Sequence, residues 1–249
     1  MLFAIYNLIE YLTEFPKLIE ISLFWILGIK IYHADKSKLN ITYTISFFVW
    51  TLYTLADLIM WITAANDETW FFIDNIIRDI QVVAAVVFAF LIFFSTQIVV
   101  KGYQGLNWKQ IYIVGSIFLA IAISIALIDK LVIKDPEGNL LDPSKWNSEP
   151  LVIVSANISL VTMILMAFPL ILYIHSIWML VRLISHKVDD KNLRKRMFNL
   201  IIGISLIPIG IVYFAIVLAI PGIYNAFMVI IGRIFWILAP IFIWKSQKK

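Results

Sequence analysis

The segment TWFFIDNIIRDIQVVAAVVFAFLIFFSTQIVV, residues 69–100, is a long and mostly apolar run. A helix needs about 20 mostly apolar residues to cross a bilayer, and this run exceeds that length. Its first half nevertheless carries Asp74, Arg78 and Asp79. A charge inside a membrane span is costly unless it finds a partner or water. The segment therefore predicts both a membrane-spanning helix and an interior polar site.

The whole sequence has the composition of an integral membrane protein. Hydrophobic residues make up 62% of its 249 residues and charged residues 14%, whereas about 25% of a soluble domain is charged. The apolar segments are continuous and do not alternate, which predicts helices and not the strands of a membrane barrel. We expect an all-α bundle of seven membrane-spanning helices in a single domain, residues 1–249. The expected spans are residues 17–34, 40–65, 69–100, 108–129, 150–184, 196–220 and 223–244.

Two segments lie outside these spans. Residues 1–15 carry a partial apolar stripe opposite Glu10 and Glu14, which predicts either an amphipathic helix on the outer surface or an extension of the first span. Residues 130–149 contain Pro136 and Pro143, and such residues predict an outer loop between the fourth and fifth spans.

Lysine and arginine gather on one side of the expected bundle. The loops after the first, third and fifth spans, with the C-terminus, hold fourteen basic and three acidic residues, whereas the other side holds four basic and ten acidic residues. Cytoplasmic loops are enriched in lysine and arginine. We therefore expect a multi-pass protein of the cell membrane with an outer N-terminus and a cytoplasmic C-terminus.

The basic loops are suited to contact anionic lipids. One of them, the run from Arg182 to Arg196, is also the candidate site for a cytoplasmic signalling partner. Its basic residues are Arg182, Lys187, Lys191, Arg194, Lys195 and Arg196.

Several functions are excluded by what the sequence lacks. The absence of cysteine excludes disulfides and thiolate catalysis, and three scattered histidines do not suit haem or zinc. Asp74 and Asp79 lie about 140° apart around a helix and do not converge on one metal ion. The patterns of intramembrane proteases and lipid transferases are missing. We expect no enzymatic activity, no catalytic residue, no metal site and no nucleic-acid partner.

The charged residues of three spans lie at a common depth. With a rise of about 1.5 Å per residue, Asp57 lies about 12 Å below the outer end of the second span. Arg78, Asp79 and Arg233 lie about 14 to 15 Å below the outer ends of the third and seventh spans. Asp74 is one helical turn from Arg78 on the same face. The sequence thus predicts a buried ionic network in which Asp57, Asp79 and Asp74 hold the two arginines.

Polar and aromatic residues at similar depth predict that the network lines a ligand pocket. Tyr53 and Trp61 share one face of the second span with Asp57, and Asn157 and Tyr213 lie about 10 Å from the outer surface. The expected ligand-binding residues are Tyr53, Asp57, Trp61, Asp74, Arg78, Asp79, Asn157, Tyr213 and Arg233. The alternative is a structural lock, in which the charges fix the helix register and bind nothing.

Seven helices with an outer N-terminus and the adjacent pair Arg78 and Asp79 are similar to microbial rhodopsins, which place an arginine and an aspartate close together on the third helix. Retinal binds covalently to a lysine in the seventh span. Residues 225–244 contain no lysine, and Arg233 is their only basic residue. A covalently bound retinal is therefore excluded, and we expect no cofactor.

The stretch LADLIMWITAANDETWFFIDNIIRDIQVVAAVVFAFLIFFSTQIVVKG, residues 55–102, resembles part of the seven-helix N-terminal sensor regions of archaeal and bacterial membrane histidine kinases. The shared features are a Trp-rich helix end, a short acidic outer loop, a charged helix start and a long apolar run ending in a basic loop. That family continues into a kinase, whereas this sequence stops at Lys249. The resemblance implies a stand-alone sensor that binds a small ligand or lipid from the outer side and signals through its cytoplasmic loops.

A transporter of protons or of a small anion is the competing prediction. An arginine beside a carboxylate tunes when that carboxylate releases its proton, which is what a proton relay needs. Transporters usually show inverted repeats and interrupted spans in corresponding halves, and neither pattern is evident in this sequence.

Overall fold

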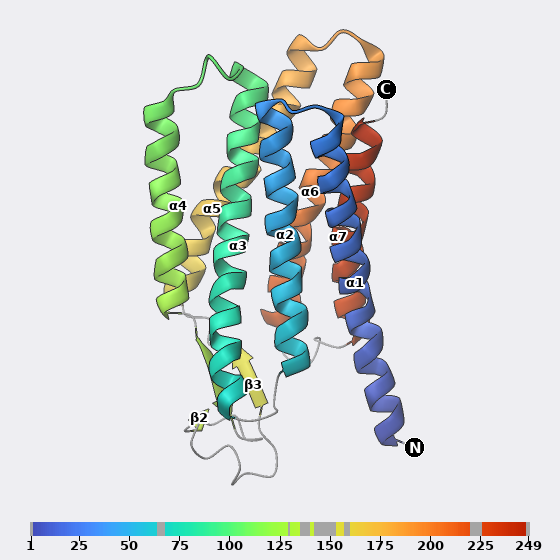
Figure 1. Ribbon diagram of the computed structural model, residues 1–249, viewed down its shortest axis with the longest axis vertical. Helices are drawn as coiled ribbons and strands as arrows, with labels where there is room; N and C mark the ends of the chain where they lie inside the picture. The colour runs from blue at the N-terminus through green and yellow to red at the C-terminus, as the bar shows by residue number, and fades with distance from the viewer. Residues whose placement is uncertain are drawn as a thin grey trace.

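The computed structural model describes residues 2–63, 68–128, 130–134, 140–141, 153–156, 160–219 and 226–247. Within these residues the chain forms seven helices and three short strands. The helices are α1 (Leu2–Ala34), α2 (Lys38–Thr63), α3 (Glu68–Lys101), α4 (Trp108–Ile128), α5 (Leu160–Lys187), α6 (Lys191–Ala219) and α7 (Ala226–Gln247). They run up and down side by side, and the two termini lie at opposite ends of the bundle (Figure 1).

Six of the described helices, α2 to α7, are long and apolar enough to cross a membrane. The seventh, α1, is comparably long but is interrupted by charged residues such as Lys17 and Glu20. It begins at Leu2 and continues through Pro16, so residues 2–15 extend the first helix and do not form a separate one. The predicted bundle of seven helices is confirmed, and six of the seven described helices have the length and composition of membrane spans.

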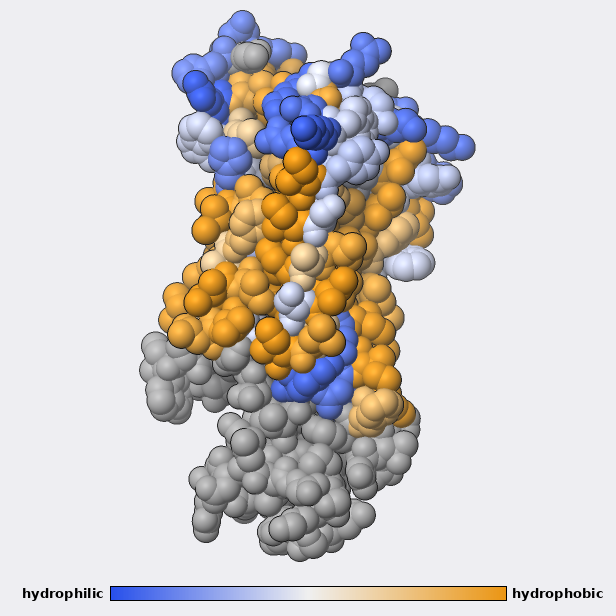
Figure 2. All heavy atoms as spheres, turned by 90° about the vertical axis from the view of Figure 1, so that its left-hand side faces the viewer, coloured by the Kyte–Doolittle hydropathy of each residue, from blue (hydrophilic) through white to orange (hydrophobic). Residues whose placement is uncertain are grey.

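One end of the bundle is hydrophilic, and a broad hydrophobic band covers the middle of the visible face (Figure 2). On α4, large apolar side chains such as Ile113, Leu119 and Leu127 are exposed, Leu127 to 73%. Contiguous apolar patches of this kind are rare on soluble monomers and mark a surface that meets lipid or another protein. The band is the surface expected of a bundle embedded in a bilayer.

The α1–α2, α3–α4 and α5–α6 connections and the end of α7 lie together at one end of the bundle (Figure 1). The same end is hydrophilic in Figure 2. The described basic residues at this end, called the basic end below, are Lys30, Lys36, Lys38, Lys101, Lys109, Arg182, Lys191, Arg194, Lys195, Arg196 and Lys245.

The core lies between the seven described helices. Its largest fully buried side chain is Trp50 of α2, whose ring lies 4.9 Å from that of Phe88 and 5.3 Å from that of Trp236. Helices α6 and α7 approach closely at Gly203, where an added Cβ would lie 2.8 Å from the carbonyl oxygen of Ala239. The backbones of α6 and α7 therefore pack directly against each other at this position.

A small sheet lies beyond α4, where the sequence predicts an outer loop and the start of the fifth span. Strand β1 (Leu131–Lys134) pairs antiparallel with both β2 (Leu140–Leu141) and β3 (Ile153–Ala156), so the strand order is β2-β1-β3. The predicted start of the fifth span at residue 150 is wrong, because α5 begins at Leu160. The segment Ile153–Ala156 is rich in β-branched residues, which favour strands, and its apolar composition alone does not separate a strand from a helix start.

Candidate functional site

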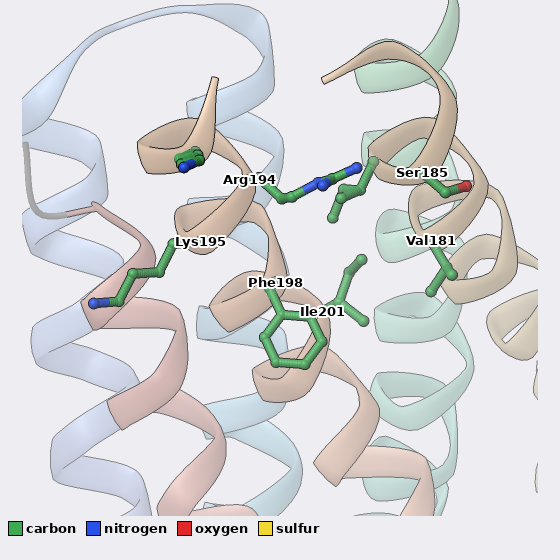
Figure 3. A pocket seen from close by; sticks show the side chains of 8 residues that line it. Val181, Ser185, Arg194, Lys195, Phe198 and Ile201 are labelled. Carbon is green, nitrogen blue, oxygen red and sulfur yellow. The ribbon is translucent and has the colours of Figure 1, made fainter. Parts of the chain in front are cut away.

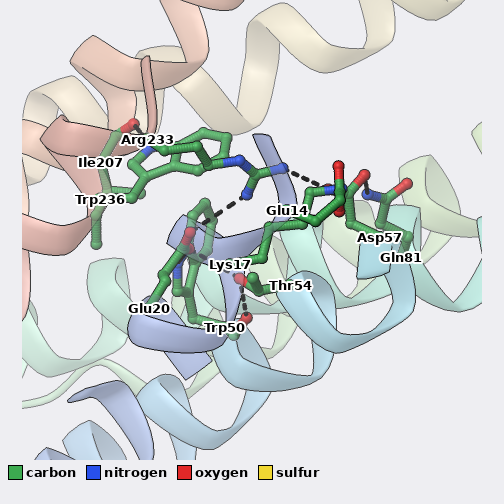
Figure 4. Close-up of polar contacts among 10 residues, drawn as sticks. All are labelled: Glu14, Lys17, Glu20, Trp50, Thr54, Asp57, Gln81, Ile207, Arg233 and Trp236. Carbon is green, nitrogen blue, oxygen red and sulfur yellow. Dashed lines mark hydrogen bonds and ion pairs between the residues drawn. The ribbon is translucent and has the colours of Figure 1, made fainter. Parts of the chain in front are cut away.

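Arg233 of α7 lies at the centre of an ionic network that ties α7 to α1 and α2 (Figure 4). Its Nη1 atom lies 3.2 Å from Oε2 of Glu20 in α1, and its Nη2 atom forms an ion pair with Oδ2 of Asp57 in α2. Arg233 is only 5% exposed and Glu20 is fully buried. The guanidinium therefore bridges two carboxylates from two different helices in the interior.

Both oxygens of the Glu20 carboxylate accept hydrogen bonds, from donors on α2 and α7. Its Oε1 atom accepts hydrogen bonds from Nε1 of Trp50 and from Oγ1 of Thr54, each at 2.8 Å. A buried charge is tolerated when it is both paired and hydrogen-bonded. These contacts explain how a fully buried acid is accommodated in the interior of the bundle.

Asp57 is shared by two cations. Nζ of Lys17 lies 2.8 Å from the same Oδ2 atom that Arg233 binds, and it also lies 2.6 Å from Oε2 of Glu14. The Asp57 side chain is 24% exposed, whereas those of Lys17 and Arg233 are each 7% exposed. Asp57 is thus the partly accessible edge of a network whose other central members are buried.

Helix α3 joins the network through a side-chain amide. Nε2 of Gln81 donates to Oδ1 of Asp57 at 3.2 Å, and Oε1 of Gln81 accepts from Nη1 of Arg78 at 2.9 Å. Arg78 is therefore linked to Asp57 through Gln81. Four helices, α1, α2, α3 and α7, contribute to one connected set of polar side chains.

Local helix periodicity places these groups on the faces that meet. Residues three or four apart lie on the same helix face. The residues on the facing surfaces are Glu14, Lys17 and Glu20 of α1, Trp50, Thr54 and Asp57 of α2, Arg78 and Gln81 of α3, and Arg233 and Trp236 of α7.

Aromatic rings enclose the guanidinium of Arg233. Its central carbon lies 4.8 Å from the ring of Trp236 and 5.7 Å from that of Phe214, which are favourable cation–π distances. Nε1 of Trp236 donates to the carbonyl oxygen of Ile207 in α6 at 3.0 Å. Tyr53 stacks on Trp50 with ring centroids 4.7 Å apart and completes this aromatic wall.

The other two acids of the predicted network have different partners. The carboxylate of Asp79 accepts from Nζ of Lys130 at 2.6 and 2.8 Å, and Asp74 accepts a hydrogen bond from Oγ1 of Thr63. Among the described contacts neither acid binds Arg78 or Arg233, contrary to the sequence-based expectation. Adjacent residues are about 100° apart on a helix, so Asp79 points to Lys130, just after α4, while Arg78 points to Gln81, which links it to Asp57 of α2.

Tyr213 lies on α6 and contacts α7, not the ionic network. Its hydroxyl donates to the carbonyl oxygen of Met228 at 3.1 Å, and its ring lies 5.7 Å from that of Phe235. The side chain of Trp61 and the whole of Asn157 lie outside the described residues. Their predicted roles in ligand binding stay predictions.

The network also contains four residues that were not predicted from the sequence, Glu14, Lys17, Glu20 and Gln81. A signal for the first three was present, because acids and a base at spacings of three residues form one charged stripe on α1. Starting the first span at residue 17 placed that stripe at the membrane surface. The signal for Gln81 was an uncharged polar residue one turn after Arg78 in a long apolar run.

The bridge made by Gln81 can be tested by Gln81→Leu. We expect this change to lower the free energy of unfolding by about 1–3 kcal/mol, because it removes the amide that bridges Asp57 to Arg78. The measurement is the unfolding free energy of the purified protein in detergent. Gln97→Leu is the matched control, since Gln97 is a similarly buried glutamine of α3 whose described contact is a weak N–H···S bond of 3.8 Å to Met179. An equal loss in both variants would contradict the bridging role.

Comparison of the chain with known protein families, with curated proteins and with solved structures found no match. Among the described residues, no group of three or more histidine, cysteine, aspartate or glutamate side chains could hold a metal ion. The most distinctive feature of the described site is the carboxylate of Asp57, which is held between two cations.

Proposed function

We propose that the protein is a receptor-like membrane sensor of seven spanning helices, in which the Arg233 network responds to a small ligand from the outer side. The observation that carries this proposal is the sharing of one Asp57 oxygen between Lys17 and Arg233 at the partly exposed edge of the network. A carboxylate held by two competing cations has alternative pairings, and a bound ligand can favour one of them.

The proposed topology includes α1 as the first span. Helix α1 runs beside α2 and α7 along the bundle (Figure 1), and its charged residues Lys17 and Glu20 have interior partners. Pairing removes much of the cost of placing those charges inside a membrane. The basic end is the cytoplasmic one, because lysine and arginine are enriched in cytoplasmic loops. The N-terminus then lies outside and the C-terminus in the cytoplasm.

The proposed ligand carries an anionic group. Lys17, Arg78 and Arg233 are the cations bound to Asp57 directly or through Gln81. An anion that reaches the exposed edge of Asp57 competes with its carboxylate for these cations. Guanidinium groups suit such a ligand because they bind carboxylate and phosphate with two parallel hydrogen bonds.

The proposed signal leaves through α6. Movement of Arg233 shifts the ring of Trp236, which is held against it and is hydrogen-bonded to Ile207 of α6. An added Cβ at Gly210 of α6 would meet the same ring. The ring therefore packs directly against the backbone of α6, and a shift of the ring displaces that helix. Small shifts at a packed interface of this kind are converted into helix movements. Helix α6 begins at the basic end, where a cytoplasmic partner would bind differently to the displaced helix.

The test is thermal stabilisation of the purified protein by a panel of small carboxylates and phosphate esters, with proton flux measured in liposomes. We expect at least one compound of the panel to raise the unfolding midpoint of the wild-type protein and no flux to be seen. Asp57→Asn is expected to increase the stabilisation, measured against that variant's own midpoint, because the neutral amide no longer competes with a ligand anion for Lys17 and Arg233. Asp79→Asn is the control, because Asp79 lies on α3 but is paired with Lys130. An equal change of stabilisation in both variants would contradict a site at Asp57.

A transporter is the second candidate, favoured by the succession of acids Glu14, Asp57 and Glu20 that Lys17 and Arg233 connect. Proton flux that Asp57→Asn abolishes would support it over the sensor. On α1, however, the next inward-facing residues after Glu20 are Phe24, Leu27 and Ile31, which are apolar and almost fully buried. They offer no group to carry a proton onward along α1. If neither stabilisation nor proton flux is observed, the result supports a network that is only a structural lock.

A further inference from the structure

A groove of about 490 Å³ lies between α5 and α6 at the basic end (Figure 3). Its volume is in the range of small-molecule sites. Its walls are mostly apolar, with Val181 and Ile184 on α5 and Phe198 and Ile201 on α6. Val181 and Phe198 are 47% and 58% exposed, so the groove opens sideways from the bundle.

Cations line the end of this groove where α6 begins. Lys191, Arg194 and Lys195 are exposed and all contribute to its lining. Arg194 extends across towards α5 and Ser185, while Lys195 points away in the same view (Figure 3). Among the residues that the structure describes, no carboxylate lies within ion-pair distance of Arg194. The nearby Asp190 is engaged in capping α6, where its carboxylate accepts from the backbone N–H of Asn192 at 2.8 Å.

We propose that this groove binds an anionic phospholipid, with the headgroup phosphate at Arg194 and Lys191 and an acyl chain along Val181, Phe198 and Ile201. Charge complementarity selects the occupant. The groove lies at the ends of the two apolar stretches of α5 and α6, where headgroups and acyl chains meet. An apolar wall directly below basic side chains matches a lipid, whereas free phosphate would use only the cations. The proposal is independent of the function assigned to the Arg233 network.

The test uses the full-length protein in nanodiscs of phosphatidylcholine with a minor share of phosphatidylglycerol. After transfer to detergent, the retained lipids are measured by mass spectrometry. We expect phosphatidylglycerol to be enriched over its share in the nanodisc. The double variant Lys191→Gln with Arg194→Gln is expected to reduce this enrichment by about fivefold per cation, the effect of about 1 kcal/mol per basic residue near a membrane surface.

Two further variants separate a lipid site from general surface charge. Lys101→Gln with Lys109→Gln removes two exposed cations from the same end of the bundle but outside the groove, and enrichment is expected to persist. Val181→Trp fills the groove without changing its charge and is expected to reduce enrichment severalfold. The unfolding midpoint of each variant in phosphatidylcholine alone reports whether it is folded.

The proposal is overturned if the Lys101 and Lys109 variant loses as much enrichment as the Lys191 and Arg194 variant, or if Val181→Trp retains all of it. Soluble glycerol phosphate is expected neither to stabilise the protein nor to displace the lipid, because it lacks the acyl chain. Displacement by glycerol phosphate or by an acidic peptide would assign the groove to a soluble anion or to a protein partner and would likewise overturn the lipid assignment.

Discussion

Replacing Arg233 with methionine is expected to lower the free energy of unfolding by about 3–5 kcal/mol. The change removes the cation that bridges Glu20 and Asp57 but leaves both carboxylates in place. Glu20 is fully buried, so water cannot replace the lost partner. Methionine keeps much of the apolar stem against Trp236. The decrease in unfolding free energy is therefore due to the lost charge and not to lost side-chain volume.

The measurement is chemical unfolding of the purified protein in detergent. Lys130→Met is the matched control, because the side chain of Lys130 is 42% exposed in its ion pair with Asp79. Exposed pairs contribute at most about 1 kcal/mol. Arg233→Lys is expected to fall between wild type and Arg233→Met, since an ammonium keeps the charge but lacks the planar fork that reaches two carboxylates. Equal effects of Arg233→Met and Lys130→Met would show that the network is not buried as described.

Replacing Trp50 with alanine is also expected to lower the free energy of unfolding by about 3–5 kcal/mol, but for a different reason. Trp50 is 1% exposed and its ring contacts those of Tyr53, Phe88 and Trp236. Alanine leaves a cavity among these rings and also removes the Nε1 donor to Glu20. The packing and hydrogen-bond contributions therefore add at one position.

Trp50→Phe separates the two contributions, because it retains an aromatic ring but lacks the donor. We expect it to cost about 1–3 kcal/mol, the penalty for a buried acceptor that loses its partner. Trp178→Ala is the control for loss of a tryptophan as such. Trp178 is 52% exposed on α5, and its cation–π contact with Arg182 at 5.5 Å is worth at most about 1 kcal/mol. A loss at Trp178 as large as that at Trp50 would contradict the assigned core.

The part of the site that the sequence predicted is the pairing of Asp57 with Arg233. Depth arithmetic placed both residues at one level, and the structure joins them in an ion pair. The same arithmetic placed Asp79 at that level, yet Asp79 binds Lys130. Depth is thus necessary for an interior pair but does not select the partner. Glu20 was missed because a span that starts at residue 17 places it within one turn of the membrane surface, whereas α1 begins at Leu2 and Glu20 lies about five turns inside that helix.

Composition and apolar run lengths by themselves determined that this chain forms a bundle of long apolar helices with charges at a shared depth, because each residue advances a helix by a constant rise. Tertiary structure alone decided which face of each helix meets which neighbour. It placed Glu20 against Trp50, Thr54 and Arg233, turned Asp79 towards Lys130, and opened the groove between α5 and α6. The rotation of a helix about its axis depends on side chains packed across from it, which are distant in sequence.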